Sequence, residues 1–118
     1  MEQGLLIVGH GSRSQEARDT FNQTVQLVRE TEEFKWVEGA HMELAEPTIP
    51  EMVKKLVSKQ VKEIIIVPYF LYKGIHIKED IPEIIGKLLE KYPEINFKLG
   101  EPIGVEPIFT NILLKRAK

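Results

Sequence analysis

The chain has 118 residues, no cysteine and a formal net charge of −2. The lack of cysteine excludes disulfides, thiolate metal sites and a cysteine nucleophile, and the charge argues against a nucleic-acid partner, which needs a basic face. No apolar run reaches the roughly 20 residues of a membrane span, and the first residues lack the basic and apolar parts of a signal peptide. We therefore expect a single cytoplasmic domain over residues 1–118 with no membrane contact.

Four apolar segments predict the strands of a sheet. The continuous apolar runs at 4–8 and 63–67 are typical of parallel strands buried on both faces, whereas the more mixed segments at 36–44 and 95–99 suit edge strands. Helical periodicity follows each of them, so the chain alternates strand and helix. This pattern predicts an α/β three-layer sandwich with a four-stranded parallel sheet in the order 2-1-3-4 and helices on both faces.

The helical segments carry apolar stripes at intervals of three and four residues. The last of these stripes contains Val105, Ile108, Phe109, Ile112 and Leu113. Two pairs have the spacing of a capping box, Thr48 with Glu51 and Asp80 with Glu83, and they predict two helix starts.

Several chemically active residues follow the predicted strands. His10 follows the first strand, Glu46 the second, His76 lies in the loop after the third, and Glu101 follows the fourth. Ligands of such sheets bind beyond the carboxyl ends of the strands, where the strand order switches. Imidazole is a common ligand of late first-row metals and also accepts protons near neutral pH. Two histidines do not make a closed structural site. The pattern therefore fits either an open site for a metal that is passed on or ordinary capping and surface histidines.

Other residues near this edge have two interpretations. His41 lies within the second predicted strand and is interpreted as a half-buried structural histidine rather than a ligand. Glu43 is interpreted as a residue of the same strand, near enough to its end to reach a ligand. Glu46 fits either a solvated carboxylate before Pro47 or a functional group. The segment 71–76 fits either an ordinary exposed loop or a wall against a flat ligand.

Four blocks of sequence together are similar to one known family. "LIVGHGSR", "MELAEPTIPE", "IIIVPYFLYKGIHIKEDIP" and "EPIG" occur in this order and resemble the short, single-lobe sirohydrochlorin chelatases, the CbiX-type cobalt or nickel chelatases. The resemblance implies a chelatase-like half-lobe that pairs as a homodimer and inserts Co²⁺, and also Ni²⁺, into sirohydrochlorin in cobalamin-type tetrapyrrole biosynthesis. The ion is then a substrate, and no cofactor stays permanently bound.

The resemblance also implies roles for individual residues. His10 is expected to be a metal ligand and the proton acceptor, and His76 the second metal ligand. Glu46 is expected to contact the tetrapyrrole, either to assist proton removal or to orient the ring. The remaining expected contacts to the tetrapyrrole are Leu71, Tyr72, Lys73, Gly74, Ile75 and His76. The groups expected to attract its carboxylates are Ser12, Arg13, Lys73 and Lys78, together with helix N-termini. The exposed apolar residues of 68–72 are the expected dimer surface.

Three alternatives remain. A nickelochelatase of coenzyme F430 biosynthesis fits the same motifs, and a non-enzymatic carrier of metal or tetrapyrrole needs the same histidines. A histidine phosphatase is disfavoured, because Gly9 stands where that family has an arginine before its histidine.

Overall fold

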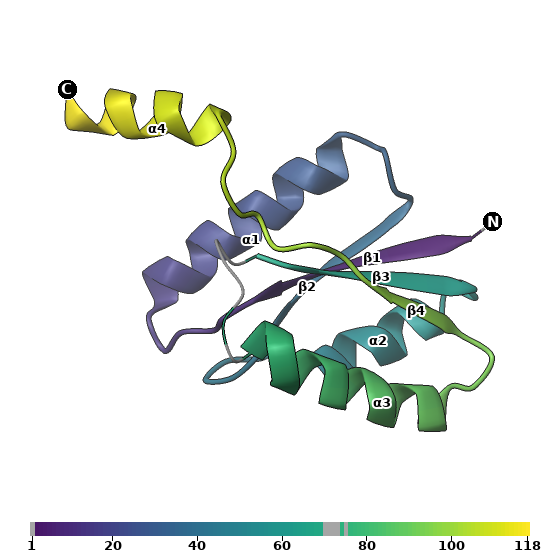
Figure 1. Ribbon diagram of the computed structural model, residues 1–118. Helices are drawn as coiled ribbons and strands as arrows, with labels where there is room; N and C mark the ends of the chain where they lie inside the picture. The colour runs from purple at the N-terminus through teal and green to yellow at the C-terminus, as the bar shows by residue number, and fades with distance from the viewer. Residues whose placement is uncertain (1, 70–73, 75) are drawn as a thin grey trace.

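The computed structural model describes residues 2–69, 74 and 76–118 and contains a four-stranded parallel sheet (Figure 1). The strands are β1 (Gln3–Gly9), β2 (Trp36–His41), β3 (Glu63–Pro68) and β4 (Asn96–Leu99). Their spatial order is β2-β1-β3-β4 and all neighbouring pairs are parallel. The predicted strand order is therefore confirmed, and the two most apolar strands, β1 and β3, occupy the centre.

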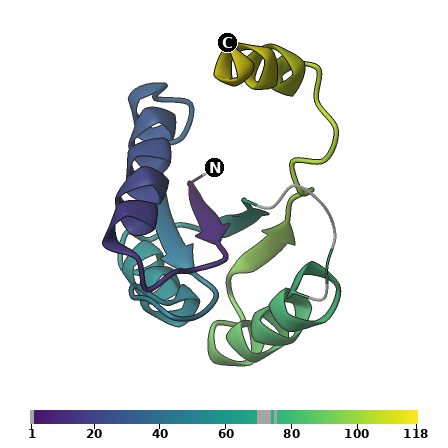
Figure 2. The same cartoon turned by 90° about the vertical axis from the view of Figure 1, so that its left-hand side faces the viewer.

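Helices cover both faces of the sheet, as predicted. The covering helices are α1 (Gln15–Glu30), α2 (Ile49–Val57) and α3 (Ile81–Lys91), with a π-helical turn η1 (His76–Asp80) leading into α3. A fourth helix, α4 (Ile108–Ala117), follows β4. Figure 2 shows α1 on one side of the sheet and α2 and α3 on the other. None of the helices in the described part of the chain has the length and hydropathy that crossing a bilayer requires.

The two central strands bury side chains on both faces because successive residues of a strand point in opposite directions. Leu6 and Ile64 are fully buried against α2 and α3. Leu5 and Ile7 face α1, where they pack with Phe21 of that helix. The sequence of these two strands is continuously apolar because both faces of each strand are buried.

The second strand is shorter than predicted. β2 ends at His41, not at residue 44, and Glu43 lies in the bends that follow, so its interpretation as a strand residue was wrong. Leu44 has a φ of 66°, in the left-handed region, which an extended strand does not contain. The chain turns here and rejoins the edge of the sheet through a bridge between His41 and Thr48.

Of the two predicted capping boxes, only the first exists. The Thr48 hydroxyl accepts a hydrogen bond from the Glu51 amide, and the Glu51 carboxylate accepts one from the Thr48 amide. Asp80 makes no capping hydrogen bond to α3, which corrects the prediction at this position. The backbone of Asp80 is already helical, with φ −70° and ψ −47°, because η1 runs directly into α3 and leaves no separate helix start.

The last helix does not cover the sheet of its own chain. The stripe that begins at Val105 predicted a helix packed on the core, but α4 begins at Ile108 and none of its residues is buried. Residues 100–107 form an irregular segment after β4, in which Gly104 has a φ of 66°. This segment carries α4 away from the sheet, as Figure 1 shows.

Candidate functional site

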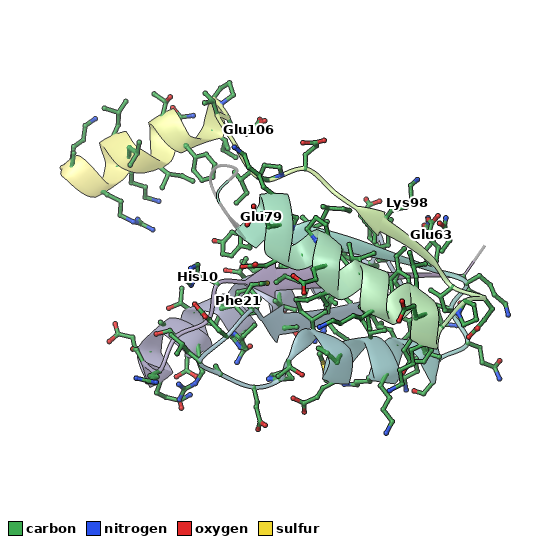
Figure 3. The ribbon with its side chains drawn as sticks, turned by 60° about the horizontal axis from the view of Figure 1, so that its bottom comes forward. His10, Phe21, Glu63, Glu79, Lys98 and Glu106 are labelled. Carbon is green, nitrogen blue, oxygen red and sulfur yellow. The ribbon has the colours of Figure 1, made fainter. Side chains whose placement is uncertain are left out.

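A cavity of about 190 Å³ lies beyond the carboxyl ends of β1, β2 and β3. Figure 3 shows His10 and Phe21 near one another at this end of the molecule, whereas Glu63 lies at the opposite end of the sheet. The cavity is lined by Gly9, His10, Gly11, Ser12, Ala17, Arg18, Thr20, Phe21, His41 and Tyr69. The edge of the sheet that the sequence predicted as the ligand site therefore carries a cavity, and His10 borders it.

Two glycines shape the turn that carries His10. A Cβ atom on Gly9 would lie 2.8 Å from the Phe21 ring, so the strand end can approach α1 closely only without a side chain. Gly11 has a φ of 103°, and a Cβ atom there would lie 1.8 Å from the carbonyl oxygen of Glu43. The loops after β1 and β2 thus touch backbone to backbone, which fixes the turn and leaves His10 exposed at the cavity.

The first turns of α1 bring positive charge to the cavity. Ser14 caps the helix by accepting a hydrogen bond from the Ala17 amide at 3.3 Å. The Arg18 guanidinium donates to the Ser12 carbonyl at 3.0 Å and to Oε1 of Gln15 at 2.7 Å, so it is held beside the glycine turn. A helix N-terminus carries a partial positive charge. A chain of net charge −2 therefore presents a local cation where an anionic ligand would enter.

Aromatic rings form one side of the cavity. The Phe21 ring is almost fully buried, and its centroid lies 5.0 Å from that of His41 and 6.1 Å from that of Tyr69. Tyr69 is held by a 2.8 Å hydrogen bond from its amide to the Val8 carbonyl, and its side chain is 43% exposed. A partly exposed ring above a buried one offers an apolar surface to a flat ligand.

His41 lies deeper than predicted, with 4% of its surface exposed. Its backbone amide donates to the Pro47 carbonyl at 2.9 Å, so its position supports the loop after β2. Burial lowers the pKa of its imidazole below the usual 6.5, and the nearby Arg18 cation lowers that pKa further. Both effects favour the neutral form of the ring, which packs against Phe21 and also borders the cavity. Its interpretation as a structural histidine stays a prediction.

Of the other predicted site residues, the structure describes Glu46, Gly74 and the backbone of His76. Glu46 is exposed in the loop after β2 and, among the described residues, is not part of the cavity lining. The backbone of His76 begins η1, two residues after the exposed Gly74. The other predicted contacts, Leu71, Tyr72, Lys73 and Ile75, lie outside the described residues. The pairing of His10 with His76 on one metal therefore remains a prediction.

Sequence reasoning did not assign several residues of the cavity lining to a ligand site, among them Arg18, Phe21 and Tyr69. It assigned Phe21 only to a core stripe, included Tyr69 only in the expected dimer surface at 68–72, and did not single out Arg18. Their common signal is position, because the first turns of a helix and the residue after a strand lie at the same edge of a parallel sheet. Of the cations that were predicted there, Arg13 is exposed and does not line the cavity in the described part of the chain.

Comparison with known proteins gives consistent matches. The family model described as CbiX matches residues 4–118. A sirohydrochlorin cobaltochelatase from Methanopyrus kandleri is 33% identical over 97% of this chain and 94% of its own. A sirohydrochlorin ferrochelatase from Bacillus subtilis is 31% identical over the whole of this chain and 45% of its own.

A solved structure extends the match to three dimensions. The sirohydrochlorin chelatase SirB from Bacillus subtilis subspecies spizizenii, in complex with cobalt, superposes with a TM-score of 0.94 at 32% identity. The superposition covers 99% of this chain and 50% of that one. The chain thus spans about half the length of the Bacillus proteins and nearly the full length of the Methanopyrus protein.

Proposed function

Because the chain belongs to the CbiX family, we propose that it is a sirohydrochlorin chelatase, an enzyme that inserts Co²⁺ into sirohydrochlorin in cobalamin-type tetrapyrrole biosynthesis. The observation that carries this proposal is the position of His10. It is an exposed imidazole on a turn fixed by glycine, at the mouth of a cavity beyond the central strands. The names of the similar cobaltochelatase and of the cobalt-bound SirB support the choice of reaction.

The reaction needs an imidazole that both binds an ion and accepts a proton. Insertion of a divalent ion removes water from the metal and releases both pyrrole N–H protons of the ring, so one metalated ring and two protons are formed. His10 holds the incoming ion through its neutral imidazole and, once the ion has moved to the ring, the same imidazole accepts a pyrrole proton. Its exposure allows that proton to pass on to solvent.

The remainder of the cavity binds and orients the ring. Sirohydrochlorin is a polycarboxylate, and Arg18 with the N-terminus of α1 attracts its carboxylates. Tyr69 and Phe21 lie against the flat macrocycle. His76 is the proposed second metal ligand, and the loop from Leu71 to His76 is proposed to contact the tetrapyrrole. Glu46 assists proton removal or orients the ring.

Cobalt is the proposed ion and nickel is accepted as well. Imidazole suits both ions, and intrinsic affinity rises from Co²⁺ to Ni²⁺, whereas Fe²⁺ lies lower in the same order. The ion is a substrate, and no metal is retained after turnover. The principal alternative is a nickelochelatase of coenzyme F430 biosynthesis, which keeps the same site and changes the pathway.

The functional unit is a homodimer. The cavity of about 190 Å³ that the described residues enclose is smaller than the roughly 300–1,000 Å³ of ordinary ligand pockets. One lobe therefore encloses only part of a macrocycle. A second copy supplies the facing wall, in agreement with the double length of the Bacillus relatives.

An absorbance assay with purified protein, sirohydrochlorin and each ion in turn tests the reaction. We expect Co²⁺ insertion well above the spontaneous rate, and a smaller enhancement with Ni²⁺. No enhancement with either ion overturns the chelatase proposal, and enhancement with nickel alone assigns the nickel pathway. Many turnovers per protein molecule exclude the carrier alternative, whereas a single stoichiometric transfer supports it.

A further inference from the structure

One buried titratable side chain, that of His41, has no part in the proposed reaction. Only 4% of its surface is exposed, yet it lines the cavity beyond the central strands. Its ring packs against the ring of Phe21, with 5.0 Å between the two centroids. Among the side chains that the structure describes, none forms a hydrogen bond with its ring nitrogens. Because buried polar atoms are normally hydrogen-bonded, these nitrogens indicate a partner that arrives with a ligand.

The guanidinium of Arg18 lies near this ring and is not neutralised by any described carboxylate. Its hydrogen bonds go to uncharged oxygens, the Ser12 carbonyl at 3.0 Å and Oε1 of Gln15 at 2.7 Å. These bonds hold the guanidinium in place and leave further N–H donors for a ligand. Burial, and then the Arg18 charge, lower the pKa of His41, so the imidazole that shares the cavity is neutral and carries one N–H donor.

The charges around the cavity match an anion. In the described part of the chain, its lining contains neither Asp nor Glu. Arg18 supplies a full positive charge, the N-terminus of α1 supplies a partial one, and His41 supplies an uncharged donor. A metal ion is disfavoured beside Arg18, because the guanidinium repels a cation. A carboxylate meets a charged donor and a neutral donor there, with no opposing charge.

The size of the cavity fits a side chain of a ligand better than a ring system. Its volume of about 190 Å³ is below the roughly 300–1,000 Å³ of pockets that enclose a drug-sized molecule. A carboxymethyl or carboxyethyl group needs much less room than a macrocycle. Tyr69, which is 43% exposed, and His10, which is also exposed, lie at the rim. A macrocycle with one such arm in the cavity therefore lies across the rim, beside both residues.

We propose that Arg18 and His41 form an anchoring subsite for one carboxylate side chain of the macrocycle, to which the Arg18 guanidinium and an N–H of the His41 ring both donate hydrogen bonds. This inference rests on the function proposed above and names the residues that fix the orientation of its substrate. With one arm held, the ring cannot rotate freely over the mouth of the cavity. The subsite therefore decides which edge of the macrocycle is presented to His10.

Titration of the purified protein with metal-free sirohydrochlorin, followed by absorbance, tests the subsite without turnover. Arg18→Gln removes the charge, and His41→Phe removes the donor but keeps a flat ring against Phe21. We expect each change to raise the dissociation constant about tenfold or more, because each removes a hydrogen bond to a charged group. His41→Gln, which retains an N–H donor, should recover part of the affinity that His41→Phe loses. Urea unfolding verifies that each variant is folded under the conditions of the titration.

Arg13→Gln is the matched control for Arg18→Gln. It removes the same charge from the turn that precedes α1, but Arg13 is exposed and, among the described residues, lies outside the cavity lining. General attraction of an acidic ligand treats the two arginines alike and is screened by salt, whereas a direct contact depends on position. The loss of affinity in Arg18→Gln should therefore exceed that in Arg13→Gln by roughly fivefold or more, also at high ionic strength.

Acetate separates the binding of a carboxylate arm from the other contacts of the macrocycle. At equal ionic strength, acetate should compete with sirohydrochlorin for the unmodified chain more strongly than chloride does, because acetate fills the subsite. In Arg18→Gln this difference between the two anions should disappear.

The outcomes separate this inference from the proposed function. Equal losses in Arg18→Gln and Arg13→Gln, or a His41→Phe protein with undiminished affinity, overturn the subsite and leave the chelatase proposal intact. Competition by acetate that only equals that by chloride does the same. Affinity that depends on Arg18 and His41, in a protein that inserts no metal, supports the subsite and overturns the chelatase proposal. No binding of sirohydrochlorin to the unmodified chain overturns both.

Discussion

The contact between Gly11 and the loop after β2 provides the sharpest test of the site geometry. In Gly11→Ala, the new Cβ atom would lie 1.8 Å from the Glu43 carbonyl oxygen, at a φ of 103° that L residues rarely adopt. The backbone conformation alone costs about 1–3 kcal/mol. A side-chain rotation cannot relieve this overlap, because the Glu43 oxygen is a backbone atom and the Cβ atom is bonded directly to the backbone of residue 11. One loop must therefore move.

We expect Gly11→Ala to lower the free energy of unfolding by about 2–4 kcal/mol. The displaced turn carries His10, and an error of about 1 Å at a reacting group can reduce a rate by about 100-fold. Metal insertion should therefore fall by at least about tenfold even under conditions where the variant is folded. Urea unfolding at fixed pH measures the first effect, and the Co²⁺ absorbance assay measures the second.

Two other glycines serve as matched controls. Gly104 has a φ of 66° but no atom closer than 4.0 Å to its Cβ position, so Gly104→Ala isolates the backbone cost at about 1–2 kcal/mol. Gly86 lies in α3 with open space around its Cβ position, and Gly86→Ala should stabilise the protein by about 0.5–1 kcal/mol. If Gly11→Ala matches Gly104→Ala in stability and keeps full activity, the backbone contact between the two loops is not what fixes the turn.

His10→Ala should abolish metal insertion without changing the urea midpoint, because the side chain is exposed, and full activity would contradict its role. His76→Ala should weaken insertion in the same direction, seen as a higher Co²⁺ concentration at half-maximal rate. Because the pKa of His41 is lowered in the folded state, the unfolded chain takes up the proton first. The contribution of neutral His41 to the free energy of unfolding is therefore full above about pH 7 and decreases as pH falls below 6.5. His41→Asn should flatten this part of the pH profile of stability measured by urea unfolding. Glu63 is 6% exposed and accepts hydrogen bonds from Gln3 at 2.6 Å and Asn96 at 2.7 Å. Glu63→Gln should cost about 1–3 kcal/mol in urea unfolding with activity unchanged.

Features that depend on neighbouring residues could be predicted from the sequence. The strand order follows from which runs are apolar on both faces, and the Thr48–Glu51 capping box needs only residues within one helical turn. The Asp80–Glu83 pair has the same spacing but fails, because the backbone before it is already helical in η1. Spacing does not reveal what precedes a helix.

Features that depend on tertiary contacts could not be predicted in this way. The apolar stripe of α4 correctly indicates a helix, but it does not show that the helix stands off the sheet, where none of its residues is buried. The position of His10 at the sheet edge follows from topology, whereas the proximity of Arg18 and Tyr69 depends on how α1 lies against β1. Helical periodicity correctly assigns Phe21 to the core, but it does not show that the same ring also lines a cavity.

Phe21 belongs both to the core and to the cavity lining, and this limits how the substrate specificity of the lobe can change. Its ring occupies space left by Gly9 and Gly39, whose Cβ atoms would lie 2.8 Å and 2.9 Å from it. Hollowing the cavity by Phe21→Ala would cost about 3–5 kcal/mol, a large share of the roughly 5–15 kcal/mol that keeps a domain folded. Enlarging the cavity toward the core to accept a bulkier macrocycle therefore destabilises the fold too much. A change of specificity must proceed through the loops that surround the opening, which can vary in length and composition without dismantling the interior.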